Sequence, residues 1–306
     1  MLEVEITSGP MSSAPTLSTA DDLPITTKSA QRTQHYAPHG SVPSILKWTG
    51  SKRSQADRIV NIAPPHNRYF EPFLGGGALL FHLARPGSLA SDIYSPLINF
   101  WKMVRDQPSH LASNYADQWQ ALQANLPEYF YVVRARFNEE QRPEDLNFLM
   151  RTCVNGIVRF SKSGGFNNSF HLSRRGMMPV KFQQIVAKWS QRLIGVEFQD
   201  CDYAEALSQA HKGDFVYLDP PYFGNKQRYI GNLDVERFYG DLESMNKRGV
   251  KWALSFDGSR GDRDYKVVLP PGVYKRCLDL DSGYSAVAKV LNGPVELVME
   301  SLYLNY

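Results

Sequence analysis

Hydrogen-bond acceptors and an aromatic ring stand together in the sequence at Asp219, Pro220, Pro221 and Tyr222. Because the prolines have no N–H and fix φ at about −65°, the backbone here is stiff. The carbonyl groups of residues 219 and 220 are therefore free to accept hydrogen bonds beside the Asp219 carboxylate. The apolar run before them, Phe215–Leu218, is typical of a strand buried on both faces of a parallel sheet. Open α/β sheets bind ligands at the carboxyl ends of such strands, so the sequence predicts a ligand site here.

A second candidate site is the glycine cluster Gly75–Gly77, between an expected strand, "RYFEPF", and an expected helix, "ALLFHLA". Glycine lets the backbone approach a ligand closely at a helix N-terminus. A phosphate-binding P-loop is excluded because Gly-Lys-Ser/Thr is absent, and a dinucleotide fingerprint fits poorly because Leu80 stands at the third glycine position. A nucleoside without phosphate, such as S-adenosylmethionine, suits this cluster, and a tight turn without a ligand is the alternative.

Acidic residues follow two further predicted strands. Asp92, at the end of "GSLASDI", could hold the ribose hydroxyls of a nucleoside bound at the glycine turn. Asp202, after "GVEFQDC", could accept from an adenine amino group, with Tyr203 stacking nearby. A helix that begins at Tyr203 offers Asp202 a second role as its N-cap, and the two roles are compatible.

The elements that must position these residues indicate an α/β fold. Strand-like segments occur towards both ends of the chain and mostly helical segments in the middle, which predicts a sheet interrupted by an inserted, mainly helical lobe. We expect the sheet domain in residues 41–100 and 191–306 and the lobe in residues 101–190. The segment "SILKW" is expected to be short and extended. Residues 1–40 are rich in Ser, Thr, Pro and Ala without a hydrophobic period, so we expect them to be disordered.

The charges are unevenly distributed, although the formal net charge of +3 is too small to indicate a partner. The segment from Leu146 to Val196 has no Asp or Glu. Its basic residues are Arg151, Arg159, Lys162, Arg174, Arg175, Lys181, Lys188 and Arg192. A local field of one sign is typical of a surface that binds a polyanion, and a solvated face that merely lacks acids is the alternative.

The composition argues against several other classes of protein. No apolar run approaches the roughly 18 residues of a transmembrane helix. Acidic residues stand where a signal peptide needs basic ones, so we expect a cytoplasmic protein. Three widely spaced cysteines, Cys153, Cys201 and Cys277, indicate neither a disulfide framework nor a zinc site, and no metal site is expected.

Five short motifs follow one another along the chain. They are "LKWTGSK", "FEPFLGGG", "ASDIYSPLI", "VNGIVRF…GGFN" and "VYLDPPY". In this order they resemble the Dam-like, D12-class DNA adenine-N6 methyltransferases, and the resemblance covers most of residues 45–306. It implies a Rossmann-like, S-adenosylmethionine-dependent methyltransferase sheet with an inserted lobe that recognises DNA. It also implies a bacterial or phage-encoded enzyme.

The resemblance implies roles for residues in each motif. The catalytic tetrapeptide would be Asp219, Pro220, Pro221 and Tyr222. The residues that bind S-adenosylmethionine would be Lys47, Trp48, Gly50, Lys52, Phe73, Gly75, Gly77, Asp92, Asp202 and Tyr203. The residues that contact DNA would be Asn155, Ile157, Arg159, Lys162, Phe166, Arg174 and Arg175, with Phe160 as a further candidate. Plainer alternatives are a core position for Trp48 and for each aromatic residue of the lobe, and an exposed helix position for Lys52.

The chemistry of such an enzyme explains the group of residues around Asp219. The exocyclic nitrogen of adenine is a poor nucleophile because its lone pair is delocalised into the ring. Acceptors at Asp219 and Pro220 would hold its two hydrogens and favour a localised lone pair, while Tyr222 stacks on the base. A base within duplex DNA must first be flipped out of the stack, and residues of the lobe would fill the gap.

Alternatives to this function remain open. Cytosine-N4 methylation would more typically have a serine in place of Asp219, RNA could be the substrate, and a DNA-binding relative could have lost methyl transfer. Relatives that modify GATC often carry a tyrosine before Asn-Gly and a Pro-Phe-Gly-Arg run after Phe-Asn. Here Val154 and "NSFHLSRR" occupy those places, which argues against a GATC target. We expect a monomer or weak dimer, and a cognate restriction endonuclease would act separately.

Overall fold

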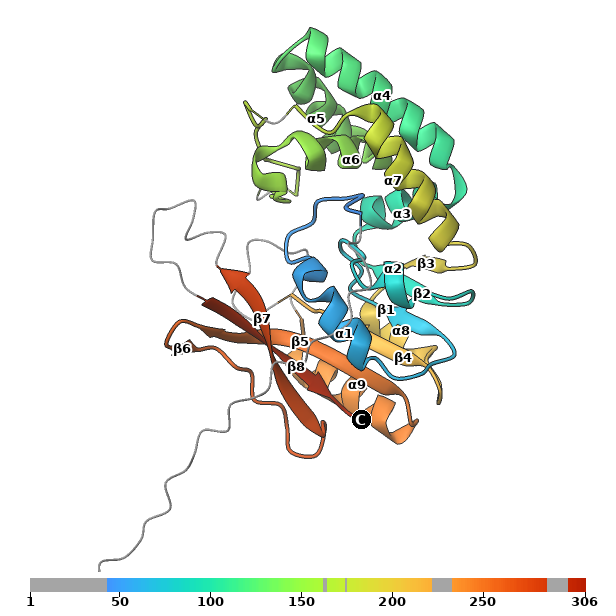
Figure 1. The fold of residues 1–306 in the computed structure, drawn as a ribbon, viewed down its shortest axis with the longest axis vertical. Coiled ribbons are helices and arrows are strands. Elements are labelled where there is room, and N and C mark those ends of the chain that lie inside the picture. The colour runs from blue at the N-terminus through green and yellow to red at the C-terminus, as the bar shows by residue number, and fades with distance from the viewer. Residues whose placement is uncertain (1–42, 162–163, 174, 222–232, 285–296) are drawn as a thin grey trace, which may run out of the picture. The chain divides into compact units, whose positions relative to one another are not determined.

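The strands pair into one sheet with a doubly wound order. The computed structural model describes residues 43–161, 164–173, 175–221, 233–284 and 297–306. The described strands are β1 (Tyr69–Glu71), β2 (Leu89–Asp92), β3 (Glu197–Asp200), β4 (Phe215–Leu218), β5 (Lys251–Arg260), β6 (Arg263–Asp264), β7 (Arg276–Tyr284) and β8 (Leu297–Leu304). Their order is β3-β2-β1-β4-β5-β8-β7, with β6 paired to β5 (Figure 1). β1 to β5 run parallel, and β8 is antiparallel to both β5 and β7.

The order of the strands reverses between β1 and β4. From β1 the chain continues outward through β2 and β3, and it then returns to the other side of β1 with β4 and β5. Ligands of open α/β sheets bind outside the carboxyl ends of the strands at such a switch point. The glycine turn follows β1 and Asp219 follows β4, so the two predicted sites lie at this point.

Helices cover both faces of the sheet. The described helices are η1 (Lys52–Ser54), α1 (Ala56–Ile62), α2 (Leu80–Leu83), α3 (Ser95–Asp106), α4 (Pro108–Ala124), α5 (Glu128–Glu140), α6 (Pro143–Thr152), η2 (Val154–Gly156), α7 (Pro179–Arg192), α8 (Tyr203–Ser208) and α9 (Val235–Lys247). The apolar side chains of the central strands divide between two clusters, as the period of two requires. In β4, Phe215 and Tyr217 pack in the cluster that includes α1, α2 and α3, whereas Val216 and Leu218 pack with α8 and α9.

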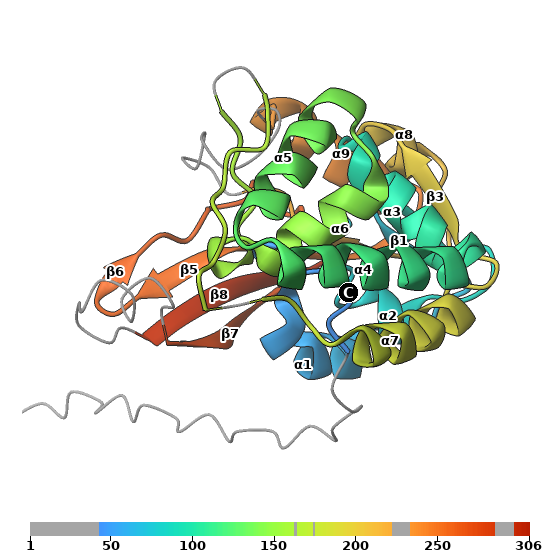
Figure 2. The same cartoon turned by 90° about the horizontal axis from the view of Figure 1, so that it is seen from above.

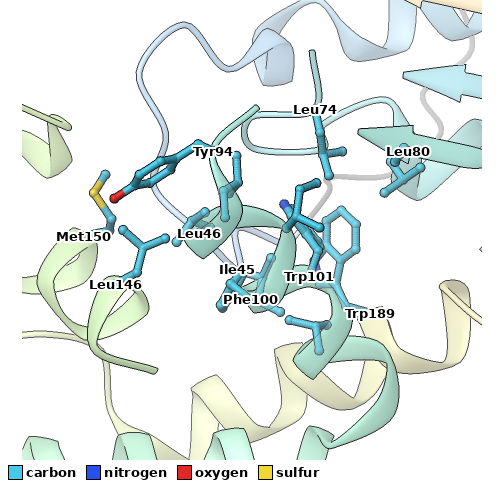
Figure 3. Packing of buried hydrophobic residues seen from close by; sticks show 14 of the residues in the cluster. Ile45, Leu46, Leu74, Leu80, Tyr94, Phe100, Trp101, Leu146, Met150 and Trp189 are labelled. Carbon is cyan, nitrogen blue, oxygen red and sulfur yellow. The ribbon is translucent and has the colours of Figure 1, made fainter. Parts of the chain in front are cut away.

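The segment between β2 and β3 carries most of the helices. Figures 1 and 2 show α4–α7 gathered beside one another, with α3 between them and the strands. We call residues 108–192, which contain α4–α7, the helical lobe. The Trp101 ring of α3 lies 4.9 Å from the Trp189 ring of α7, and its Nε1 donates to the Gly75 carbonyl at 3.2 Å. The close-up in Figure 3 shows Tyr94 extending towards Leu146 and Met150 of the lobe. The lobe and the sheet therefore share one continuous core.

The segment that leads into the "LKWTGSK" motif is held by the lobe rather than by a strand. Arg151 is buried, and its guanidinium donates to the carbonyls of Ser44, at 2.7 Å, and Ile45. Trp189 Nε1 donates to the Pro43 carbonyl at 2.8 Å. No strand forms in residues 44–48, and Ile45 and Leu46 form a bend where the sequence predicts a short extended segment. The carbonyls of residues 43–45 bond to side chains of the lobe instead.

The main features of the predicted fold are confirmed. The α/β sheet, the glycine turn after β1 and the helical insertion after β2 occupy the expected places. The boundary expected at residue 101 falls inside α3, and residues 36–306 form one compact unit, so the division into two domains stays a prediction. Among the described residues, no helix has both the length and the apolar character needed to cross a membrane.

Candidate active site

One cavity of about 210 Å³ brings the glycine turn and the Asp219 motif together. Its walls include residues 48–52, residues 71–78 and residues 219–221. The helical lobe adds Val158 and Phe160 to the same cavity. Two predicted sites and part of the lobe therefore face a single space.

The glycine turn needs glycine for its own conformation and packing. Gly75 and Gly77 have φ angles of +48° and +60°, which other residues rarely adopt. A Cβ atom on Gly75 would lie 2.8 Å from the Trp48 ring, and one on Gly77 would lie 2.9 Å from the Trp101 ring. The tight-turn interpretation is therefore correct for these glycines, and the turn also lines the cavity.

Asp92 is held at the carboxyl end of β2, beside the glycine turn. Its carboxylate accepts from the backbone N–H groups of Gly75, at 3.4 Å, and Tyr94, at 3.1 Å. Burial raises the pKa of Asp92 to about 6, and these two hydrogen bonds oppose the shift. The carboxylate is thus fixed in position at the edge of the cavity.

Asp202 and two stacked aromatic rings line another part of the cavity. Asp202 caps α8 by accepting from the Ala204 N–H at 3.0 Å, which confirms the predicted N-cap role. The Phe73 and Tyr203 rings stack at 5.2 Å with an angle of 25°. Arg237, at the start of α9, donates to Asp202 at 2.8 Å and lies over the Tyr203 ring. The sequence did not indicate Arg237, because α9 reaches this place only through the fold.

Lys52 and Asp219 form an ion pair in the interior of the cavity. Lys52 Nζ lies 2.6 Å and 2.8 Å from the two carboxylate oxygens of Asp219. Only 5% of the Lys52 side chain is exposed, so the alternative of an exposed helix residue is wrong. Burial raises the pKa of Asp219 to about 6, Lys52 opposes this shift, and the charge of Glu300 adds to it.

A second buried carboxyl group, Glu71, lines the cavity at the end of β1. Its Oε2 accepts from the Tyr69 hydroxyl at 3.0 Å. Burial raises the pKa of Glu71 to about 8, and the charge of Asp219 contributes to the increase. Glu71 was not among the predicted site residues, although it directly precedes Pro72 and Phe73 in the "FEPFLGGG" motif.

The residues of the "LKWTGSK" motif separate in the structure. Trp48 and Gly50 line the cavity, and Trp48 also packs against the core, as its plainer alternative predicts. Lys47 is not among the lining residues of the cavity. Its aliphatic stem lies against Gly156 of the lobe, where an added Cβ would be 2.7 Å from Lys47 Cδ.

The predicted DNA-binding residues differ in exposure. Asn155 and Arg159 are exposed, Ile157 is half-buried, and Arg175 is exposed. Phe166 is a correction, because its side chain is only 2% exposed and packs edge-on to Phe137 in the core. It is therefore a structural residue and not a DNA contact.

Parts of the basic segment also have structural roles. Arg151 is buried, and Arg192 donates to the carbonyls of Phe81 and His82. Lys181 and Lys188 on α7 are exposed. Three of the predicted site residues, Tyr222, Lys162 and Arg174, lie outside the described residues, as do residues 1–40.

Several proteins that are similar to the chain are named as methyltransferases or DNA adenine methylases. The chain is 30% identical over 189 residues to the type II methyltransferase M1.LlaDCHI of Lactococcus lactis, and it spans 58% of its own length and 65% of that protein. It is 27% identical over 226 residues to a DNA adenine methylase of Vibrio cholerae, covering 69% of the chain and 80% of the relative. It is 30% identical over 247 residues to the type II methyltransferase M.MjaIII of Methanocaldococcus jannaschii, covering 70% and 84%.

A family model spans the sheet and the lobe together. It matches residues 48–257, which include the glycine turn, the helical lobe and the Asp219 motif. The match therefore covers the walls of the cavity from Trp48 to Arg237. The sheet is accordingly a Rossmann-like methyltransferase sheet, and the chain belongs to the D12 class N6 adenine-specific DNA methyltransferase family.

Proposed function

We propose that the chain transfers a methyl group from S-adenosylmethionine to the N6 amino group of an adenine flipped out of duplex DNA. The observation that supports this most is the shared cavity, in which Gly75–Gly77 and Asp219–Pro220 line one space. Direct methyl transfer requires the donor and the acceptor nitrogen to lie within about 3–3.5 Å of each other. Two separate cavities would have been incompatible with this function.

The residues around the glycine turn fit S-adenosylmethionine. Asp92 and Asp202 provide carboxylates for the ribose and the adenine amino group, and Phe73 and Tyr203 provide apolar walls. The hydroxyls of Thr49 and Ser51 are buried in the cavity wall and have no hydrogen-bond partner among the described residues. Buried polar atoms usually have partners, so these hydroxyls suit the polar methionine end of a ligand. When bound, S-adenosylmethionine supplies an electrophilic methyl group on a sulfonium centre.

The residues around Asp219 fit the target amino group. An ionised Asp219 carboxylate and the Pro220 carbonyl would each accept one N6 hydrogen, and the stiff Pro220-Pro221 backbone keeps them in place. Phe160, whose ring lies edge-on to Tyr94 at 5.4 Å, adds an aromatic wall from the lobe. After methylation the nitrogen carries a positive charge and loses one proton, so no base is needed before the attack.

The helical lobe would hold the DNA. Arg159, Arg175, Lys181 and Lys188 are exposed and come from the acid-free segment. Such residues fit phosphate contacts, which provide affinity and orientation without reading sequence. We further propose that the enzyme acts in the cytoplasm as a monomer or weak dimer, and that any cognate restriction endonuclease acts separately. The difference at Val154 from relatives that modify GATC supports another target sequence.

The test is transfer of a labelled methyl group from S-adenosylmethionine to DNA of mixed sequence. We expect N6-methyladenine in the digested product, whereas N4-methylcytosine or labelled RNA would support the alternatives. Asp219→Ala should reduce transfer by about 10³-fold, because an aligned acceptor in a buried site is lost, and should leave cofactor binding largely intact. Asp117→Ala, which removes an exposed carboxylate on α4, is the matched control.

Two outcomes would contradict the proposal. Near-normal turnover of the Asp219→Ala variant would remove the role assigned to this carboxylate. DNA binding without any methyl transfer would favour a relative that has lost catalysis.

If the protein methylates DNA, sequencing DNA from cells that express it, with detection of modified bases, would identify the target sequence.

A further inference from the structure

Lys52 lies between two carboxylates that belong to different strands. Its Nζ donates to both oxygens of Asp219, which follows β4, and lies 3.6 Å from Oε2 of Glu300 on β8. That Oε2 atom is buried and has no hydrogen-bond partner among the described residues. A buried carboxylate oxygen without a donor is unfavourable. Glu300 Oε2 can therefore accept a hydrogen bond from the Lys52 ammonium group, which at present donates to Asp219.

The pairing of β8 explains how Glu300 reaches this place. Along β8, Leu302 and Leu304 pack in the core cluster that includes α1, and Glu300 shares their face because it precedes Leu302 by two residues. The pairing of β8 with β5 shifts between Asp257 and Ser259. Gly258 allows this shift, since an added Cβ would lie 2.5 Å from the Met299 carbonyl oxygen.

The proposed reaction creates a competition for Asp219. The N6 amino group of the target adenine must donate to this carboxylate, yet Lys52 occupies both of its oxygens. An ammonium group that stayed there would neutralise the charge that the amino group needs. Lys52 therefore requires a second acceptor within a short distance, and a displacement of about 1 Å would bring its Nζ within hydrogen-bond distance of Glu300.

We propose that Glu300 is a positioning residue that takes the Lys52 ammonium from Asp219 when the target amino group binds. This inference rests on the proposed function. Without the adenine, Lys52 neutralises Asp219 and keeps its carboxylate in place. With the adenine bound, Lys52 pairs with Glu300, and Asp219 keeps its full charge for the nitrogen on which positive charge develops.

The charged groups that face Asp219 agree with this arrangement. They come from three neighbouring elements: Lys52 from η1, Glu300 from β8, and Glu71 with Tyr69 from β1. The Glu300 carboxylate itself faces Lys52 and lies opposite Asp257 of β5 and Leu280 of β7 in the sheet. Lys52 is thus the basic group that the two carboxylates share.

The test compares Glu300→Gln with the wild type on plasmid DNA that contains the mapped target sequence. The amide keeps the shape of the side chain but cannot hold an ammonium group by charge. We expect kcat to fall by about 10- to 100-fold while the KM values for DNA and S-adenosylmethionine stay within about 3-fold. The acid side of the pH–rate profile should move to lower pH, because the negative charge of Glu300 no longer opposes ionisation of Asp219.

Two further variants separate this role from a structural one. Glu300→Asp keeps the charge and should recover part of the lost rate. Asp279→Asn makes the same carboxylate-to-amide change on the adjacent strand β7, where the residue is exposed and pairs with Lys266. It should behave as the wild type does. A Glu300→Gln variant with the wild-type kcat and pH profile would overturn the inference.

A structural measurement covers the case in which Glu300→Gln fails to fold. In a complex of the wild type with S-adenosylhomocysteine and a duplex carrying the target adenine, Lys52 Nζ should lie within about 3.2 Å of the Glu300 carboxylate. Nζ still bonded to both oxygens of Asp219 would overturn the inference. A wild-type protein that methylates no DNA contradicts the proposed function instead, and the inference then falls with it.

Discussion

At the scale of single residues, two carboxyl groups that line one cavity differ in pKa. The pKa of Asp219 is raised to about 6 and that of Glu71 to about 8, with burial as the main cause of both shifts. Only Asp219 has a cation in contact, and the charge of Lys52 limits the increase in its pKa. Near neutral pH, Asp219 is therefore mostly ionised and accepts hydrogen bonds, whereas Glu71 is mostly protonated.

The ionisation of Asp219 predicts the acid limit of activity. Methyl transfer needs the carboxylate form, so the single-turnover rate should fall as the pH is lowered through about 6. Binding of S-adenosylmethionine, measured in parallel, separates this loss from release of the cofactor. A rate that stays constant down to pH 4.5 would be inconsistent with an Asp219 acceptor.

The burial of Glu71 predicts a dependence of stability on pH. Its pKa rises from an ordinary value of 4.5 to about 8, so folding favours the protonated form. The resulting stabilisation is complete below about 4.5 and is lost as the pH rises through about 8. The melting temperature of the Glu71→Gln variant should therefore decrease less between pH 6 and pH 9 than that of the wild type. Glu243→Gln, an exposed change on α9, is the control, and equal losses in both variants would show that Glu71 does not ionise in this range.

At the scale of elements, the turn after β1 is held by packing against tryptophan rings. Gly75 and Gly77 combine left-handed backbone angles with close contacts to Trp48 and Trp101. Trp101 belongs to α3 and also contacts Trp189 of the lobe. The position of the turn thus depends on the helices beyond it, and a side chain here would disturb more than the local backbone.

Two glycine substitutions test this difference. Gly77→Ala should destabilise the protein by about 1–3 kcal/mol, since it adds both backbone strain and a clash with Trp101. Gly240→Ala lies in α9, where a Cβ would have no atom within 4 Å, and should stabilise the protein by about 0.5–1 kcal/mol. Chemical denaturation measures both changes. Stabilisation by Gly77→Ala would contradict the described turn.

Elements with strong local patterns could be predicted from the sequence, and contacts between distant segments could not. Phe215–Leu218 formed the predicted buried strand because its apolar run is sufficient to indicate one. Residues 44–48 form no strand, and Ile45 and Leu46 form a bend, because Arg151 and Trp189 bind the carbonyls of residues 43–45. β6 is too short to carry a pattern and was missed.

The same distinction holds for the candidate site. Asp202 was predicted as a cap, since a cap is a local feature, and the structure confirms it. Its partner Arg237 is 35 residues away, and the residues of the Lys52–Asp219 pair are 167 apart. No spacing rule relates such residues. For Phe166 the resemblance implied a DNA contact and a core position was the alternative, because an aromatic residue suits both. Its burial and its contact with Phe137 are features of the fold that the sequence does not reveal.

At the scale of the whole molecule, the helical lobe carries the exposed basic residues of the segment from Leu146 to Val196, which has no Asp or Glu. All four residues, Arg159, Arg175, Lys181 and Lys188, lie between β2 and β3 in the chain. None of them lines the cavity, although Arg159 stands between Val158 and Phe160, which do. Affinity for DNA and methyl transfer should therefore respond to different substitutions.

Salt dependence of DNA binding tests this separation. If these four residues contact phosphates, the affinity of the Asp219→Ala protein should fall on the order of 100-fold between 50 mM and 200 mM salt. Arg159→Gln should lower the slope of log K against log salt by about 1. Lys251→Gln, an exposed change at the amino end of β5, should leave the slope unchanged. Equal slopes for all three proteins would place the DNA elsewhere.

The hold of Arg151 and Trp189 on residues 43–45 bears on chimaeras that exchange target specificity between relatives. The helical lobe lies in one continuous segment between β2 and β3, so replacing it with the lobe of a relative requires only two junctions in the chain. The transplanted helices must also supply a guanidinium and an indole N–H that donate to the carbonyls of the segment before Trp48, as Arg151 and Trp189 do. These acceptors are main-chain oxygens, which every residue type supplies. A lobe from a relative that has Arg and Trp at these two positions could therefore be exchanged without changing the sequence of residues 43–45.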